Sequence, residues 1–203
     1  MARSQTRTLT IALVPAIAAA IFMALVTDAG AERAGRVGLA GGKTRAGVRI
    51  SADAGRLSGR QVTVACASNA DEWAQRLTDV GLPGAADEYY GFSLIHRGEM
   101  HLSPYVCEGL RLGASAPMRR SHELQVAWAV NVLIHESVHL ARSSPDEQIA
   151  EACARVALPR ELHRLYRVEY RSAQMRRMTA AAAWFRRTMP PGYQGGICSA
   201  RGA

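Results

Sequence analysis

The sequence is poor in lysine and in aromatic residues. Its 203 residues include one lysine, Lys43, so nearly all the positive charge is arginine, and only 6% of the residues are aromatic. No known nucleic-acid motif is present, which argues against specific nucleic-acid binding. No internal repeat is visible, so a repeat architecture is not expected.

An export signal is predicted at the amino terminus. Arg3 and Arg7 precede an apolar run over residues 9–26, and the small residues 29–31 follow. This order is typical of a secretory signal peptide, with cleavage after Ala31. The run is 18 residues long, so it could instead remain as a membrane anchor. Both outcomes predict an extracytoplasmic protein, secreted or anchored, because positive charge precedes the single span.

Four cysteines, Cys66, Cys107, Cys153 and Cys198, fit an oxidising compartment. Their spacing is too wide for a cysteine zinc site, so two disulfides are predicted, and three pairings are possible. We favour Cys153 with Cys198, because that bond would tie the C-terminal tail to a predicted helix. Cys66 with Cys107 then follows by elimination.

The composition divides the chain into three parts. After the signal or anchor (1–31), residues 32–60 are rich in Gly, Ala and Arg, and we predict a flexible spacer. Residues 61–203 suffice for one domain with one core. In this domain the patterns predict a strand over 61–66, a hairpin of 92–96 with 99–103 around Arg97-Gly98, and helices over 71–80, near 107–110, 121–144, 145–157 and 160–189.

Residues 135–139 read H-E-x-x-H, in a segment that has no Gly or Pro from 121 to 144. A helix places His135 and His139 one turn apart on the same face, where both imidazoles can bind one zinc ion while Glu136 lies beside it. The surrounding segment is apolar, so these groups would be costly to bury unless they were paired or metal-bound. The motif predicts one Zn²⁺ per chain, with Glu136 as the general base that activates a water for hydrolysis.

A catalytic zinc site uses three protein ligands, so a third one is required. The predicted helix over 145–157 carries Glu147 and Glu151 on one face, and the short loop after Leu140 would turn it back toward the motif. We favour Glu147 as the third ligand. Glu151 either orients a histidine or is itself the ligand. Asp146 is the weaker candidate, because an acidic residue at a helix start is usually a cap.

The H-E-x-x-H motif, followed by E-x-x-A-x-x-x-A and Leu-Pro, resembles the gluzincin type of zinc peptidase, especially the ImmA/IrrE-type metallopeptidases. The resemblance covers about residues 120–160 and implies peptide-bond hydrolysis with a glutamate ligand on the second helix. The matching residues are His135, Glu136, His139, Glu147, Ala150, Ala154, Leu158 and Pro159. We therefore expect an α+β, mostly helical, zincin-like domain with a small antiparallel sheet.

A peptidase would take a peptide or protein substrate, which could pair with the edge of the predicted hairpin. His163, Tyr166 and Tyr193 are candidate hydrogen-bond donors to the developing oxyanion. His96 and His101 are predicted to lie on the surface or a strand face rather than to bind metal.

Two other functions stay open. The first is a zinc-binding envelope protein without catalytic activity. The second is a basic module that binds acidic envelope polymers through an arginine stripe, which consists of Arg160, Arg164, Arg167 and Arg171 at helical spacing.

Overall fold

The computed structural model describes residues 45–82, 85–115 and 117–199. The predicted signal peptide or anchor, its cleavage site and the first part of the predicted spacer lie outside these residues. Within the described ranges, no helix combines the length and the apolar character that crossing a bilayer requires.

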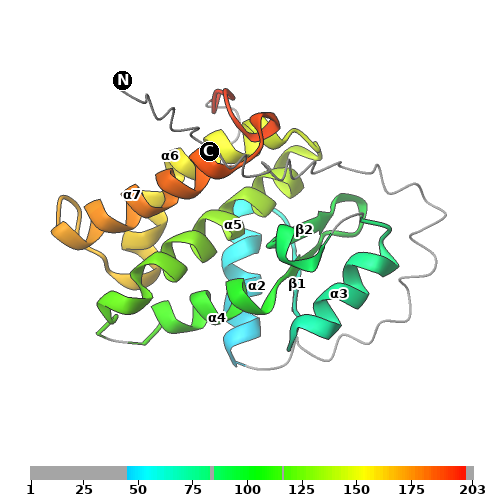
Figure 1. The fold of residues 1–203 in the computed structure, drawn as a ribbon, viewed down its shortest axis with the longest axis horizontal. Helices are drawn as coiled ribbons and strands as arrows, with labels where there is room; N and C mark the ends of the chain where they lie inside the picture. Colours follow the sequence, from blue (N-terminus) through cyan, green and yellow to red (C-terminus); the bar gives the residue numbers. More distant parts are fainter. Residues whose placement is uncertain (1–44, 83–84, 116, 200–203) are drawn as a thin grey trace, which may run out of the picture.

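Helix α5 (Glu123–Arg142) is the centre of the fold (Figure 1). Every residue from 126 to 140 is buried, including the whole H-E-x-x-H motif. Its neighbours cover it on several sides: α2 (Arg45–Ser58), α4 (Pro104–Gly113), α6 (Glu147–Tyr166), α7 (Ala173–Thr188) and strand β2 (Gly91–Leu94). A helix covered in this way gains stability from apolar residues on all its faces, which explains its apolar sequence.

Helix α2 shows that the predicted spacer is wrong over its second half, because Arg45–Ser58 is a helix packed on α5. Ile50 and Ala54 of this helix are buried in the core, and Leu57 packs against it. Polar contacts add to this packing: Arg49 donates to the Leu165 carbonyl, and Ser51 accepts from the backbone N–H of Val64. The folded domain therefore includes residues 45–58 and does not begin at 61.

The sheet is small, and it is mixed rather than entirely antiparallel as predicted. The strand order is β1 (Thr63–Cys66), β3 (Glu99–Leu102), β2, with β1 parallel and β2 antiparallel to β3. The parallel pair arises because α3 (Ala70–Asp79) lies between β1 and the hairpin, and parallel strands need such a crossover. The β2–β3 hairpin is confirmed, but a short 3₁₀ turn (Ile95–Arg97) and Gly98 at φ 65° connect the strands. The mostly helical α+β class is confirmed.

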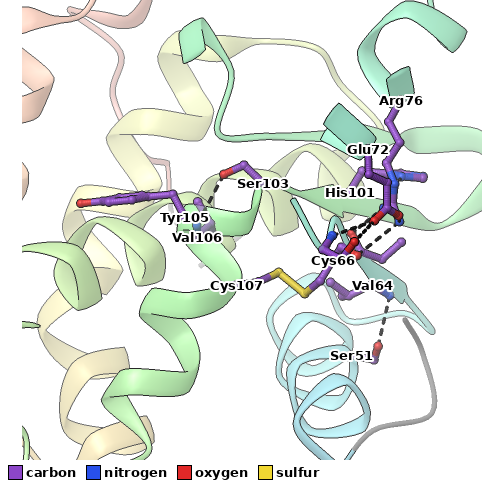
Figure 2. The surroundings of a disulfide bond; sticks show 12 residues. Ser51, Val64, Cys66, Glu72, Arg76, His101, Ser103, Tyr105, Val106 and Cys107 are labelled. Atoms are coloured by element: carbon purple, nitrogen blue, oxygen red, sulfur yellow. Dashed lines mark hydrogen bonds and ion pairs between the residues drawn. A yellow bond between two sulfur atoms is a disulfide. The ribbon is translucent and has the colours of Figure 1, made fainter. Parts of the chain in front are cut away.

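Both predicted disulfides are present. Cys66–Cys107 joins β1 to α4 (Figure 2), and Cys153–Cys198 joins α6 to the C-terminal tail. Figure 2 also shows the Ser103 side chain, which caps α4 by accepting from the Val106 N–H.

Helix α6 is longer than predicted, because it continues through Pro159 to Tyr166. The buried side chains of Leu158 and Leu162 anchor this half of the helix in the core, which outweighs the local cost of proline. Arg167 ends the helix with φ 58°, and α7 is a separate helix, so one helix over 160–189 was a wrong prediction.

The end of α6 also divides the predicted arginine stripe. Arg160 and Arg164 extend from the helix, whereas Arg167 is its C-cap and Arg171 lies in the following link with φ 63°. Arg160 and Arg164 both contact the fully buried Glu161, which also pairs with Arg56 of α2. Glu161 thus connects α6 to α2.

We predict that Glu161→Gln lowers the free energy of unfolding by about 2 kcal/mol at neutral pH. Burial alone would raise the pKa of Glu161, but hydrogen bonds and charge from Arg164 and Arg56 lower it below its ordinary value of 4.5. The ionised carboxylate therefore stabilises the fold above that pH, and this stabilisation is lost as the pH falls through the depressed pKa.

Urea unfolding at about pH 7 and about pH 3 measures this effect, and the difference between the two chains should shrink at the lower pH. Glu108→Gln is the matched control, because Glu108 forms an exposed pair with Arg111 one helical turn away. We expect it to change stability by less than about 0.5 kcal/mol. A difference for Glu161→Gln that is independent of pH would contradict the ionic role.

Candidate metal centre

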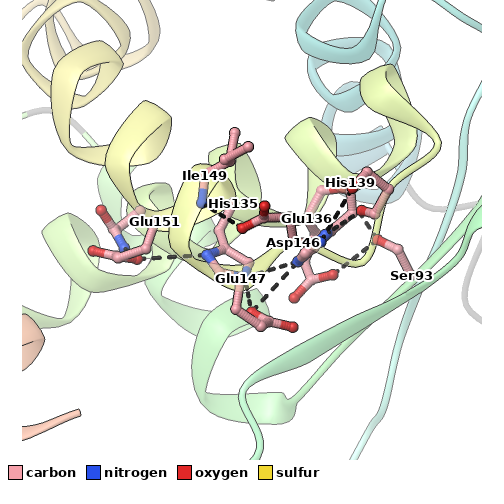
Figure 3. A network of polar contacts seen from close by, with 10 residues as sticks. Ser93, His135, Glu136, His139, Asp146, Glu147, Ile149 and Glu151 are labelled. Atoms are coloured by element: carbon pink, nitrogen blue, oxygen red, sulfur yellow. Dashed lines mark hydrogen bonds and ion pairs between the residues drawn. The ribbon is translucent and has the colours of Figure 1, made fainter. Parts of the chain in front are cut away.

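The motif residues face a second helix across a short link. Ser143, with φ 49°, ends α5, and the Asp146 side chain caps α6 by accepting from the Ile149 N–H. The four-residue link therefore turns the first residue of α6, Glu147, toward the imidazoles of α5 (Figure 3). The predicted capping role of Asp146 is confirmed.

Three donor atoms converge between these helices. The Nε2 atoms of His135 and His139 are 3.0 Å apart, and Oε2 of Glu147 lies 2.8 Å from the first and 3.5 Å from the second. Donors about 2.1 Å from one tetrahedral zinc ion would be separated by about 3.4 Å. The observed separations lie on both sides of this value, so the three residues fit one metal ion.

The outer hydrogen bonds of the imidazoles strengthen this reading. Nδ1 of His139 lies 2.8 Å from the Ser144 carbonyl, which can only accept, so this nitrogen carries a hydrogen. Nδ1 of His135 faces the Glu151 carboxylate at 3.5 Å, which favours the same tautomer. In neutral rings both Nε2 atoms are then lone-pair acceptors. Two acceptors and the Glu147 carboxylate meet at one buried point, and such a group needs a cation.

The pKa values of the metal-free site also indicate that these three groups need a positive charge between them. Burial alone would lower the pKa of His135, but hydrogen bonds to Glu147 and Glu151 outweigh it and raise the pKa to about 10. Burial alone would raise the pKa of Glu147, but hydrogen bonds to the two histidines lower it to about 2. A proton on imidazole thus supplies the positive charge that a metal ion would supply. Metal binding would release that proton.

Glu151 lies behind His135 rather than among the three donors. It is 2% exposed, and its Oε2 accepts a 3.1 Å hydrogen bond from the Asn131 side chain in addition to facing His135. This arrangement fits the orienting role that the sequence left open for Glu151, and Glu147 occupies the favoured ligand position. Asn131 was missed, although a lone amide four residues before His135 in an apolar run was a visible signal.

The site opens into a cavity that follows one face of α5. Residues 128, 131, 132, 135, 136 and 139 line it at helical spacing, and β2 forms the facing wall. At about 1.5 Å per residue, the cavity extends about 10 Å along the helix from His135 to Trp128. Tyr90, Trp128, Val132 and Met189 make this part of its lining largely apolar.

The C-terminal strap, residues 190–199, closes another side of the site. The Tyr193 ring stacks on His135 with centroids 5.9 Å apart. Burial and the charges of Glu147 and Glu136 raise the pKa of Tyr193, so its hydroxyl stays a donor. The strap is held by Cys153–Cys198, by the hydrogen bond from Arg142 to the Ser199 carbonyl, and by Gly196. A β-carbon at Gly196 would lie 2.0 Å from the Gln148 carbonyl oxygen, so only glycine allows this approach to α6.

The other sequence candidates lie away from the three donors. His96 is exposed, and His101 stacks on Phe92 on the sheet, as predicted for both. His163 lies 3.1 Å from the Val168 carbonyl through Nδ1, and Tyr166 donates to the Leu110 carbonyl. Of the three candidate oxyanion donors, the structure brings Tyr193 to the site.

Comparison of the chain with models of known protein families, with curated proteins and with solved structures finds no match. The resemblance to ImmA/IrrE-type metallopeptidases over about residues 120–160 thus stays a prediction.

We predict that His139→Ala and Glu147→Ala each abolish stoichiometric zinc binding, because each removes one of three converging donors. Glu151→Gln should retain zinc but bind it about 10- to 100-fold more weakly, since it keeps the shape and loses the charge behind His135. Mass spectrometry of the native protein gives the stoichiometry, and competition with a chelator gives the affinity. His96→Ala is the control for loss of an imidazole. If Glu147→Ala bound zinc fully and Glu151→Gln lost it, Glu151 would be the ligand and Glu147 would not.

We also predict that the two disulfides differ in their effect on the site. Cys153→Ser/Cys198→Ser should weaken zinc binding about tenfold, because the strap no longer holds Tyr193 on His135. Cys66→Ser/Cys107→Ser removes a bond of similar loop length between β1 and α4, neither cysteine of which lines the cavity, and should leave zinc affinity unchanged in the folded chain. The same chelator competition, with circular dichroism to verify folding, measures both. Equal zinc affinities in the two double variants would show that the strap does not contribute to zinc binding.

Proposed function

We propose that this protein is an exported, zinc-dependent metallopeptidase that hydrolyses peptide bonds. The main support for the proposal is that His135, His139 and Glu147 converge on one point. The carboxylate of Glu136 lies beside them and is not one of the three candidate ligands. Two imidazoles and one carboxylate are a donor set that catalytic zinc sites use, with a fourth position left for water.

The residues of the chain would divide the work of hydrolysis. His135, His139 and Glu147 would hold the zinc ion, which supplies an activated water and polarises the substrate carbonyl when bound. Glu136 would accept a proton from the attacking water and return it to the leaving amine. Tyr193 would donate a hydrogen bond to the oxygen on which negative charge develops.

The cavity supports a peptide as the substrate. Strand β2 pairs with β3 along one edge, and its residues line the cavity opposite the metal donors. An extended peptide could add to the other edge of β2 through main-chain hydrogen bonds, which would align its carbonyl with the site. A distance of about 10 Å along α5 accommodates about three extended residues.

Export is supported by the two disulfides, which are typical of oxidising compartments. The predicted signal or anchor would bring the domain there. A polymer-binding module receives less support, because Arg160 and Arg164 are engaged with Glu161 and the predicted stripe is divided. A zinc-binding protein without activity differs from the peptidase only in what Glu136 does.

Glu136→Gln separates these two functions. We predict that it leaves one zinc ion per chain and lowers the rate of hydrolysis of unfolded casein by about 10²- to 10⁴-fold, because glutamine cannot accept the proton. Zinc content and fluorescent-casein hydrolysis are measured on the same preparation, with Glu108→Gln, which lies outside the cavity lining, as the control for loss of a carboxylate. Zinc binding without hydrolysis in the unmodified chain, across several protein substrates, would favour the non-catalytic function.

A further inference from the structure

Ser93 of strand β2 makes a direct contact with the proposed general base. Its hydroxyl lies 2.8 Å from Oε2 of Glu136 and 3.1 Å from the Glu136 backbone carbonyl (Figure 3). Glu136 is 6% exposed and comes from the middle of the most buried helix. A hydrogen bond from a hydroxyl to a buried carboxylate is charge-assisted, so it restricts the carboxylate strongly.

The backbone of β2 explains why this contact forms. Gly91 lies two residues before Ser93, on the same face of the strand. A β-carbon there would lie 3.1 Å from Val132 and 3.2 Å from Glu136, so the glycine lets β2 approach α5 closely. Phe92, between them, stacks on Trp73 and His101 on the other side. The alternation of the strand therefore directs Ser93 at Glu136.

The contact joins the two walls of the cavity at the reacting end. Glu136 belongs to the helix that carries two of the metal donors, and Ser93 belongs to the strand whose outer edge would receive the substrate. With one oxygen held by Ser93, the remaining oxygen and its lone pairs are available to the cavity. A long, flexible glutamate side chain would otherwise sample several rotamers.

We propose that Ser93 is a positioning residue that holds the Glu136 carboxylate in the orientation needed to accept the proton. This inference rests on the proposed peptidase function. It adds that the substrate-binding strand and the base are mechanically connected, so a displacement of β2 also displaces the base.

The test compares Ser93→Ala and Ser93→Thr in the full chain with its disulfides formed. Threonine keeps the hydroxyl and suits a strand, whereas alanine removes it with little change in shape. Ser137→Ala is the matched control, because it removes a buried hydroxyl from the residue after Glu136, where the hydroxyl bonds to the Leu133 carbonyl instead. Three quantities are measured: zinc content, kinetics on unfolded casein, and the affinity of the zinc-loaded chain for acetohydroxamic acid.

Acetohydroxamic acid is a zinc chelator that gives up a proton when it binds, so its affinity depends on a base held beside the metal. We expect Ser93→Ala to keep its zinc, to lose at least about tenfold in kcat with KM changed less than about twofold, and to bind the hydroxamate about tenfold more weakly. Ser93→Thr should recover at least half of each loss. Ser137→Ala should match the unmodified chain.

The outcomes separate the two proposals. If the unmodified chain binds zinc and Ser93→Ala matches it in kcat and hydroxamate affinity, the positioning role is wrong while the peptidase remains. If the unmodified chain binds zinc and does not hydrolyse casein, the hydroxamate affinities alone decide whether Ser93 positions Glu136. If it binds no zinc, both proposals are overturned.

Discussion

Two imidazole nitrogens and one carboxylate meet inside this protein at a point where, with both rings neutral, all three are hydrogen-bond acceptors. His139 and His135 direct their Nε2 atoms there because their Nδ1 atoms face a carbonyl and the Glu151 carboxylate. In a buried place, such a group is stable only with a positive charge at its centre. Much of the surrounding structure serves to hold this arrangement.

The helices divide this task. Helix α5 is covered on all sides, so its motif residues have little freedom, and the link after Ser143 returns α6 at the distance where Glu147 completes the set. The buried Glu161 connects the far end of α6 to α2. Asn131 and Glu151 lie behind His135, so the orientation of this ring depends on both helices.

The elements on the cavity side come from distant parts of the chain. Strand β2 brings Ser93 to Glu136, and the strap brings Tyr193 to His135. The Cys153–Cys198 bond fixes the strap to α6 one and a half turns after Glu147. The site that we propose for peptide hydrolysis is therefore assembled by tertiary contacts around a motif that is local.

The sequence by itself determined the motif helix, the capping role of Asp146 and the position of two glutamates on the next helix, and it limited the disulfides to three possible pairings. These features depend on helical spacing, capping chemistry and the small number of cysteines, all of which act over short distances or few alternatives. Only the tertiary structure decided that residues 45–58 form a helix, because this helix packs on α5 and Arg56 pairs with Glu161.

Tertiary structure also decided that α6 passes through Pro159, since burial of Leu158 and Leu162 outweighs a local preference. The parallel pairing of β1 with β3 and the contact of Ser93 with Glu136 depend on strand register across tens of residues. A shift of register by one residue would turn every side chain to the other face, so the register is fixed by which side chains meet in the core, and that depends on elements outside the strand.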